Sequence, residues 1–157
     1  MKLNSRSYFH NQFIPFKFCR HTLAAGQNKS PNFSWEDFPP NTKSFVLTFI
    51  DRHPKAKNKI HWLLADIPRS ITNIPEGASN SSSMPSGVKE LLNAYGQNGY
   101  DGPEPPKGDP KHNYEAIVYA LKSEKSGISA PIDEKKLMKK IKSNVVAQAN
   151  LLGYFNY

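Results

Sequence analysis

Several features that define other protein classes are absent from this sequence. It has a single cysteine, Cys19, which excludes an intrachain disulfide and a zinc site built from several thiolates. No apolar run approaches the roughly 20 residues needed to span a bilayer. Residues 1–13 are too polar for the core of a signal peptide. We therefore expect a cytoplasmic protein.

The sequence also lacks the short motifs of several enzyme classes. Neither a Gly-x-Ser-x-Gly nucleophile motif nor a glycine-rich phosphate loop of the Walker or dinucleotide type occurs. No neighbouring feature marks the Cys19 thiolate as stabilised, so this residue is expected to be small and buried rather than nucleophilic. We expect no catalytic residue and no cofactor.

Positive charge exceeds negative charge, with a formal net charge of +8. The basic residues gather in residues 52–59 and in the C-terminal third, at Lys135, Lys136, Lys139, Lys140 and Lys142. Such segments can bind nucleic acid or an anionic membrane surface. However, no basic patch carries interleaved aromatic residues, which disfavours nucleic acid.

Proline is abundant, with 13 residues in a chain of 157. This is about 8%, against an average near 5%. Prolines between apolar runs punctuate short strands and ordered loops. We expect one mainly β domain over residues 1–157, since no linker or repeat divides the chain.

Two segments predict a β-hairpin that gathers polar side chains at one end. Residues 44–51 and 60–67 are rich in β-branched and aromatic residues. The hairpin would bring Asp51 close to His61, and His53 would share the face of Asp51 if the first strand continued for two residues. The cluster suits a metal ion, acid–base catalysis or anion capture, and an ordinary solvated hairpin end is the alternative.

A proline- and glycine-rich segment, residues 99–111, predicts a long, stiff loop. It leads into a predicted strand, residues 112–121, whose alternation places His112 and Tyr114 on one face. These two residues would either bind a ligand beside the rigid loop or serve only in packing and hydrogen bonding.

Apolar residues recur at helical spacing near the C-terminus, from Leu137 through Ile141 and Val145 to Ala149. This spacing predicts an amphipathic helix over residues 133–152, with Asp133 and Glu134 in its first turn. The lysines named above would lie on its exposed side.

The order of several motifs resembles the phosphatidylethanolamine-binding protein family, which includes the Raf kinase inhibitor protein, and most of all its bacterial branch. The matching segments are Ser30-Pro31-Asn32-Phe33-Ser34-Trp35, Pro40-Asn41-Thr42-Lys43-Ser44, His61-Trp62, Ile67-Pro68, Ile74-Pro75-Glu76-Gly77, and Gly99 through Pro106-Lys107-Gly108 to His112-Asn113-Tyr114. The last of these is the most specific.

This resemblance implies a large antiparallel sheet packed on a smaller sheet, with Greek-key connections and a C-terminal helix. It also implies a small anion-binding pocket at the sheet edge. The pocket would be lined by Asp51, His61, Pro106, His112 and Tyr114. A departure from the family occurs at residues 51–54, where His53 stands in place of a second carboxylate. We therefore add His53 to the expected ligand-binding residues.

Three functions follow from these observations. The leading one is a non-enzymatic module that binds a small phosphate- or carboxylate-bearing ligand, with control of a protein kinase or serine protease as the output that the resemblance implies. The second is a metal-assisted hydrolase that uses Asp51, His53 and His61. The third is electrostatic binding to a membrane surface or nucleic acid. A homodimer is a further open interpretation.

Overall fold

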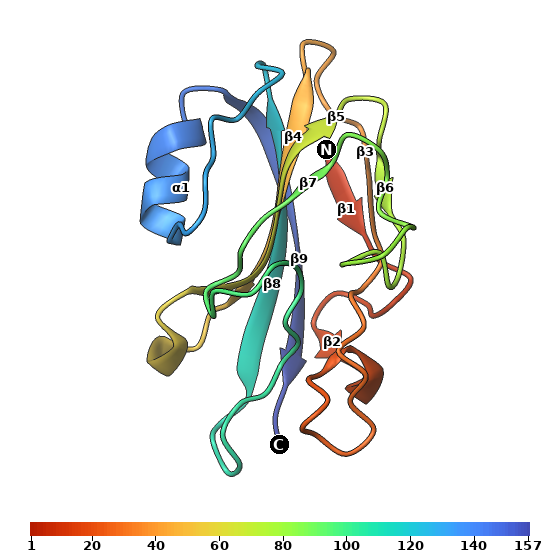
Figure 1. The fold of residues 1–157 in the computed structure, drawn as a ribbon, viewed down its shortest axis with the longest axis vertical. Coiled ribbons are helices and arrows are strands. Elements are labelled where there is room, and N and C mark those ends of the chain that lie inside the picture. Colours follow the sequence, from red (N-terminus) through yellow and green to blue (C-terminus); the bar gives the residue numbers. More distant parts are fainter.

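Two β-sheets and one α-helix form three layers in the computed structural model, which describes residues 1–157 (Figure 1). The large sheet has the order β2 (Gln12–Phe13), β9 (Val145–Phe155), β8 (His112–Leu121), β4 (Ser44–Asp51), β5 (Lys59–Pro68) and β7 (Lys89–Glu90). The small sheet has the order β1 (Lys2–Asn4), β3 (Phe33–Glu36) and β6 (Asn73–Ile74). Helix α1 (Glu134–Ile141) covers the opposite face of the large sheet.

The expected mainly β fold, with a large sheet on a smaller one, is confirmed. One detail differs, because β2 runs parallel to β9 and makes the large sheet mixed rather than antiparallel. Two short 3₁₀ helices, η1 (Phe16–Phe18) and η2 (Pro54–Ala56), complete the elements. No helix is long and apolar enough to cross a membrane.

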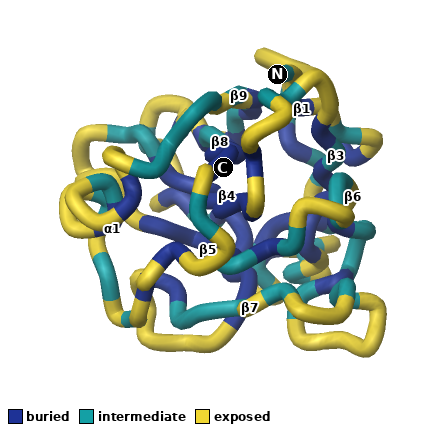
Figure 2. Tube along the Cα trace, turned by 90° about the horizontal axis from the view of Figure 1, so that it is seen from above, coloured by how far each residue is buried: buried dark blue, intermediate teal, exposed yellow.

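Strand β4 shows how the sequence builds the layers. All eight of its residues are buried, so both faces of the strand are covered. Alternation sends Phe45, Leu47 and Phe49 into the core that also holds Phe33 of the small sheet. The intervening residues, such as Val46, pack in a second cluster with Leu137 of α1. Figure 2 shows the central strands buried and the surrounding loops exposed.

The C-terminal helix is shorter than predicted. Helix α1 begins after Asp133, whose side chain caps it by accepting the Lys136 N–H at 2.8 Å, and it ends at Ile141. Residues 145–152, which we expected to be helical, belong to β9. Helical spacing and alternation overlap here, since Ala147, Ala149 and Leu151 are also two residues apart. Pairing with β8 along nearly its whole length decides in favour of the strand.

The two predicted strands of the hairpin are confirmed. Strands β4 and β5 are antiparallel neighbours, with Asp51 opposite Lys59, and η2 lies in the connection. Strand β8 begins at His112 as predicted and pairs with β4 on its other side, so that Tyr114 lies opposite Asp51. The end of β4 and the starts of β5 and β8 therefore meet at one end of the large sheet.

Candidate functional site

A pocket of about 300 Å³ opens where these three strand ends meet the proline-rich loop. Its lining includes five of the six residues expected from the sequence: Asp51, His61, Pro106, His112 and Tyr114. The structure thus brings together side chains that are up to 63 positions apart in the chain. The sixth expected residue, His53, stands beside the pocket rather than in its wall.

The Asp51 carboxylate is buried and fully engaged. Its Oδ2 lies 2.7 Å from Nδ1 of His112, and its Oδ1 accepts the backbone N–H of His53 at 2.8 Å. Because a carboxylate only accepts hydrogen bonds, Nδ1 of His112 carries the proton. Asp51 therefore fixes the orientation and the tautomer of the His112 ring.

His61 is held in the same way by a different acceptor. Its Nδ1 lies 2.7 Å from the backbone carbonyl oxygen of Asp101, so Nδ1 again carries the proton. The ring stands edge-on to Tyr114 and is almost completely buried. This burial lowers the pKa of His61 below its ordinary value, and the contributions of the Asp101 carbonyl and the Asp51 charge oppose the shift. His61 is therefore a neutral imidazole near pH 7.

Tyr114 supplies a hydroxyl group between the two histidines. Its ring stacks on Phe49 with a centroid distance of 5.6 Å, which fixes its direction. Burial, together with the negative charge of Asp51, raises the pKa of Tyr114 above its ordinary range. The hydroxyl stays protonated and is available as a donor.

Two ring nitrogens of the pocket lack partners within the protein. Nε2 of His61 and Nε2 of His112 are both buried and make no hydrogen bond, although the latter lies 3.6 Å from Oδ2 of Asp109. Unpaired buried polar atoms are uncommon in folded proteins because each costs about 1–3 kcal/mol. In one pocket they leave two hydrogen-bonding positions open to a ligand or to water.

Arg20, which the sequence analysis did not single out, anchors the proline-rich loop. Its Nε donates to Asp101 at 2.6 Å, its Nη1 donates to Glu104 at 2.8 Å, and its Nη2 forms a second contact with Asp101. The guanidinium also lies over the ring of Tyr95, 4.4 Å from the centroid. The loop is therefore held against the pocket by a bidentate ion pair and a cation–π contact.

The basic residues of 52–59 are partly neutralised. Arg52 pairs with Glu115 at 2.6 Å and with Glu134 at 2.7 Å, and Lys55 pairs with Asp109 at 2.6 Å. Ion pairing reduces the charge that these side chains can offer to a phosphate backbone or a membrane. The lysines of α1 remain exposed.

His53 does not lie where strand continuation would have placed it. Strand β4 ends at Asp51, and His53 caps η2 by accepting the Lys55 N–H at 3.3 Å. Its ring stacks on His112 with a centroid distance of 3.9 Å. The ligand set Asp51, His53 and His61 proposed for a hydrolase is therefore wrong. Asp51 is engaged by His112 and by the His53 N–H, and the three side chains form no common group of ligand atoms.

Comparison with known proteins agrees with this geometry. A family model described as phosphatidylethanolamine-binding protein matches residues 4–156. A UPF0098 protein of Aquifex aeolicus is 33% identical over 155 residues, covering 99% of this chain and 88% of that protein.

Two crystal structures share the fold. The structure of Escherichia coli YbcL, a member of the mammalian PEBP family, superimposes with a TM-score of 0.90 at 27% identity, covering 99% of this chain and 98% of the other. A Chlamydia trachomatis homologue, CT736, gives a TM-score of 0.80 at 26% identity, covering 99% and 97%. This chain belongs to the phosphatidylethanolamine-binding protein family, whose members are mostly non-catalytic binding proteins.

Proposed function

We propose that this protein binds a small oxyanion, a phosphate- or carboxylate-bearing group, in the pocket between β4, β5, β8 and the proline-rich loop, without converting it chemically. The observation that carries the proposal is the pair of buried, unpartnered Nε2 atoms of His61 and His112 in one pocket.

The two histidines and Tyr114 offer complementary chemistry to such a group. Nδ1 of His112 donates to Asp51, so Nε2 of the neutral ring presents a lone pair to the pocket. Tyr114 adds a donor, its hydroxyl. His61 stays neutral, so its Nε2 offers a lone pair and accepts a hydrogen bond.

A pocket with one donor and two acceptors suits an oxyanion that still carries a hydroxyl. A phosphate monoester in its monoanionic form has such a hydroxyl, as does a carboxylic acid. Sulfate has none near neutral pH and would place an oxygen lone pair against the lone pair of His61. Of the two ligand classes, the phosphomonoester therefore fits the pocket better than a carboxylate, which has no hydroxyl when ionised.

The lining residues favour binding over turnover. None of the 13 residues that line the pocket is a serine, threonine or cysteine that could act as a nucleophile. Asp51, the carboxylate nearest to both histidines, is already committed to His112 and His53. In this proposal, control of a protein kinase or protease would follow from capture of a phosphorylated side chain by the pocket.

The test is thermal stability measured against inorganic phosphate, phosphoethanolamine and phosphoserine. Ligand at about 100 times its dissociation constant stabilises the native state by about 2.7 kcal/mol, which is a readily measured shift in Tm. The shift should disappear in His112→Ala and persist in His21→Ala, an exposed histidine outside the pocket. Equal shifts in both variants, or none in the native protein, would overturn the proposal.

The three ligands also separate the sources of the group. A preference for phosphoethanolamine indicates a lipid headgroup, and a preference for phosphoserine indicates a phosphorylated protein. Equal affinities show that the pocket reads only the phosphate.

A further inference from the structure

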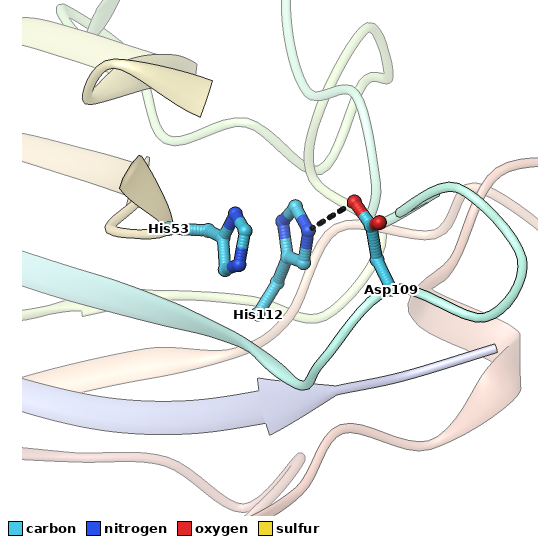
Figure 3. A group of neighbouring side chains, drawn as sticks. All are labelled: His53, Asp109 and His112. Carbon is cyan, nitrogen blue, oxygen red and sulfur yellow. Dashed lines mark ion pairs between the residues drawn. The ribbon is translucent and has the colours of Figure 1, made fainter. Parts of the chain in front are cut away.

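Three potential metal ligands meet at the mouth of the pocket. They are His53 from the start of η2, Asp109 from the proline-rich loop and His112 from the first position of β8 (Figure 3). Each offers one ligand atom, and these atoms lie within 4.8 Å of one another. Asp109 and His112 are three positions apart in the chain, and the fold brings His53 to them.

His112 has the environment of a prepared metal ligand. Asp51 binds its Nδ1, and the lone pair of Nε2 therefore points outward, unpaired and buried. Only 3% of His112 is exposed. A carboxylate behind a histidine is the usual outer partner in metal sites, where it fixes the ring and raises its basicity.

Asp109 faces this lone pair with another acceptor. Its Oδ2 is also buried without a hydrogen bond and lies 3.6 Å from Nε2 of His112. The two atoms attract each other only when a cation, either a proton on Nε2 or a metal ion, lies between them. The distance is long for a hydrogen bond, but two ligands of one metal with bonds of about 2.0–2.1 Å lie about 3.4 Å apart in a tetrahedral site.

The neighbouring contacts leave these atoms available. Lys55 pairs with the other oxygen of Asp109, Oδ1, at 2.6 Å and leaves Oδ2 free. His53 is only partly buried, and its single ring hydrogen bond, to the Lys55 N–H, is long at 3.3 Å. Its ring can turn from the stacked position to direct a nitrogen at the same point as Nε2 of His112.

We propose that His53, Asp109 and His112 form a binding site for one divalent transition-metal ion of the zinc, copper or nickel type. Two imidazoles and a carboxylate suit these ions, whereas Mg²⁺ and Ca²⁺ prefer sets of oxygen ligands. Three protein ligands leave a position open for water or for an oxygen of the pocket's anion. The bound ion would place a positive charge beside the pocket.

The experiment uses the untagged full chain after dialysis against EDTA, titrated with Zn²⁺ and with Cu²⁺. We expect one equivalent to bind. Loss of a direct ligand in His53→Ala or Asp109→Asn should weaken binding by more than the roughly 10- to 100-fold that loss of an outer partner costs. A double variant, His10→Ala with His21→Ala, removes two histidines outside the cluster and should bind as the native protein does.

Spectroscopy with Cu²⁺ identifies the ligands directly. The electron paramagnetic resonance spectrum should show two imidazole nitrogens in the native protein and one in His53→Ala. Lys55→Met should bind Zn²⁺ more tightly, because Asp109 loses the ion pair that competes with the metal. A damaged fold would not produce such a gain.

The result that overturns the proposal is Zn²⁺ affinity unchanged by His53→Ala, or affinity lost in the His10/His21 double variant. The phosphate-dependent Tm shift, measured in EDTA, should persist in His53→Ala because His53 lies outside the pocket lining. Failure of metal binding with retention of that shift would refute the metal site alone. Loss of the shift from the native protein would instead refute the anion pocket.

Discussion

Asp51 holds His112 in one tautomer: Oδ2 lies 2.7 Å from Nδ1, while Oδ1 accepts the His53 N–H at 2.8 Å. Both oxygens have fixed partners, so the carboxylate cannot turn without breaking a hydrogen bond. Because Nδ1 carries the proton, Nε2 on the other side of the neutral imidazole offers a lone pair to the pocket. One buried carboxylate therefore decides whether the pocket presents an acceptor or a donor.

Asp51→Asn should shift anion and metal affinity in opposite directions. The amide oxygen would keep the His53 N–H, and the amide nitrogen would take the place of Oδ2 and donate to Nδ1 of His112. The neutral ring would then carry its proton on Nε2. In mildly alkaline buffer, phosphate affinity should rise by about tenfold or more, since a buried negative charge is also removed. Zn²⁺ affinity should fall roughly 10- to 100-fold. Calorimetric titration measures both.

Asp51→Ala is the matched control, because it removes the charge without supplying the amide donor. It should weaken zinc binding and raise phosphate affinity less than Asp51→Asn does. Parallel changes of both affinities in Asp51→Asn would contradict the tautomer argument.

The native pocket should bind phosphate about tenfold to a hundredfold more tightly than sulfate. This range corresponds to the cost of leaving one buried acceptor without a hydrogen bond. The physical reason is the neutral His61, whose Nε2 accepts a hydrogen bond that only the protonated oxyanion can donate. Competition between the two ions in the thermal assay measures the ratio. His61→Gln, whose amide also donates, should reduce the preference. Equal affinities in the native protein would refute the assigned role of His61.

Strand positions could be predicted from the sequence because they depend on local patterns. Residues 44–51 and 112–121 alternate or are uniformly apolar, and the observed β4 and β8 have those bounds. The position of His53 could not be predicted in this way. Whether a strand continues past Asp51 depends on the turn that follows, and here His53 caps a 3₁₀ helix. Likewise, only pairing with β8 distinguishes β9 from an extension of α1.

Arg20 was missed for a related reason. It lies in a segment, residues 18–22, in which the sequence shows no motif that points to a partner. Its partners, Asp101 and Glu104, are 81 and 84 positions away in the chain. The only sequence feature that points to Arg20 is the pair of acidic residues in the proline-rich loop, Asp101 and Glu104, which need a basic partner from elsewhere in the chain.

Unfolding free energy should fall as the pH falls below the ordinary histidine value of 6.5, partly because of His61. Burial lowers the pKa of His61 in the folded state, so the unfolded chain binds the proton more readily. The contribution of His61 to the unfolding free energy is complete above pH 6.5. It is lost progressively as the pH falls toward the folded-state pKa. Urea titrations at a series of pH values should show a shallower decline for His61→Gln than for the native protein. Identical slopes would contradict this contribution.

Cys19 should resist thiol reagents in the folded protein. The residue is fully buried, and burial raises the pKa of its thiol to about 12. A reagent therefore cannot reach the sulfur, and the reactive thiolate form is scarce. Labelling with a chromogenic disulfide should be slow until denaturant is added. Ser82→Cys introduces an exposed thiol as the matched control, which should react at once. Rapid reaction of Cys19 under native conditions would show that its segment opens readily.

Gly102→Ala should destabilise the fold and loosen the pocket together. A Cβ at this position would lie 2.1 Å from the Phe18 carbonyl oxygen and 2.9 Å from backbone atoms of Cys19, so backbone must move. Overpacking of this kind costs about 1–3 kcal/mol or more. The loop would move away from residues 18–20, where Arg20 anchors it, and phosphate affinity should fall as well.

Gly127→Ala tests whether that cost comes from the clash. Gly127 has a φ of +69°, but an added Cβ would meet no atom within 4 Å. Gly127→Ala should therefore lower the unfolding free energy only by the roughly 1–2 kcal/mol that a left-handed backbone costs an alanine. It should keep the native phosphate affinity. Denaturant melts and the thermal assay distinguish the two variants. If Gly102→Ala bound phosphate as tightly as Gly127→Ala, the close approach of the proline-rich loop to Phe18 would not be what shapes the pocket.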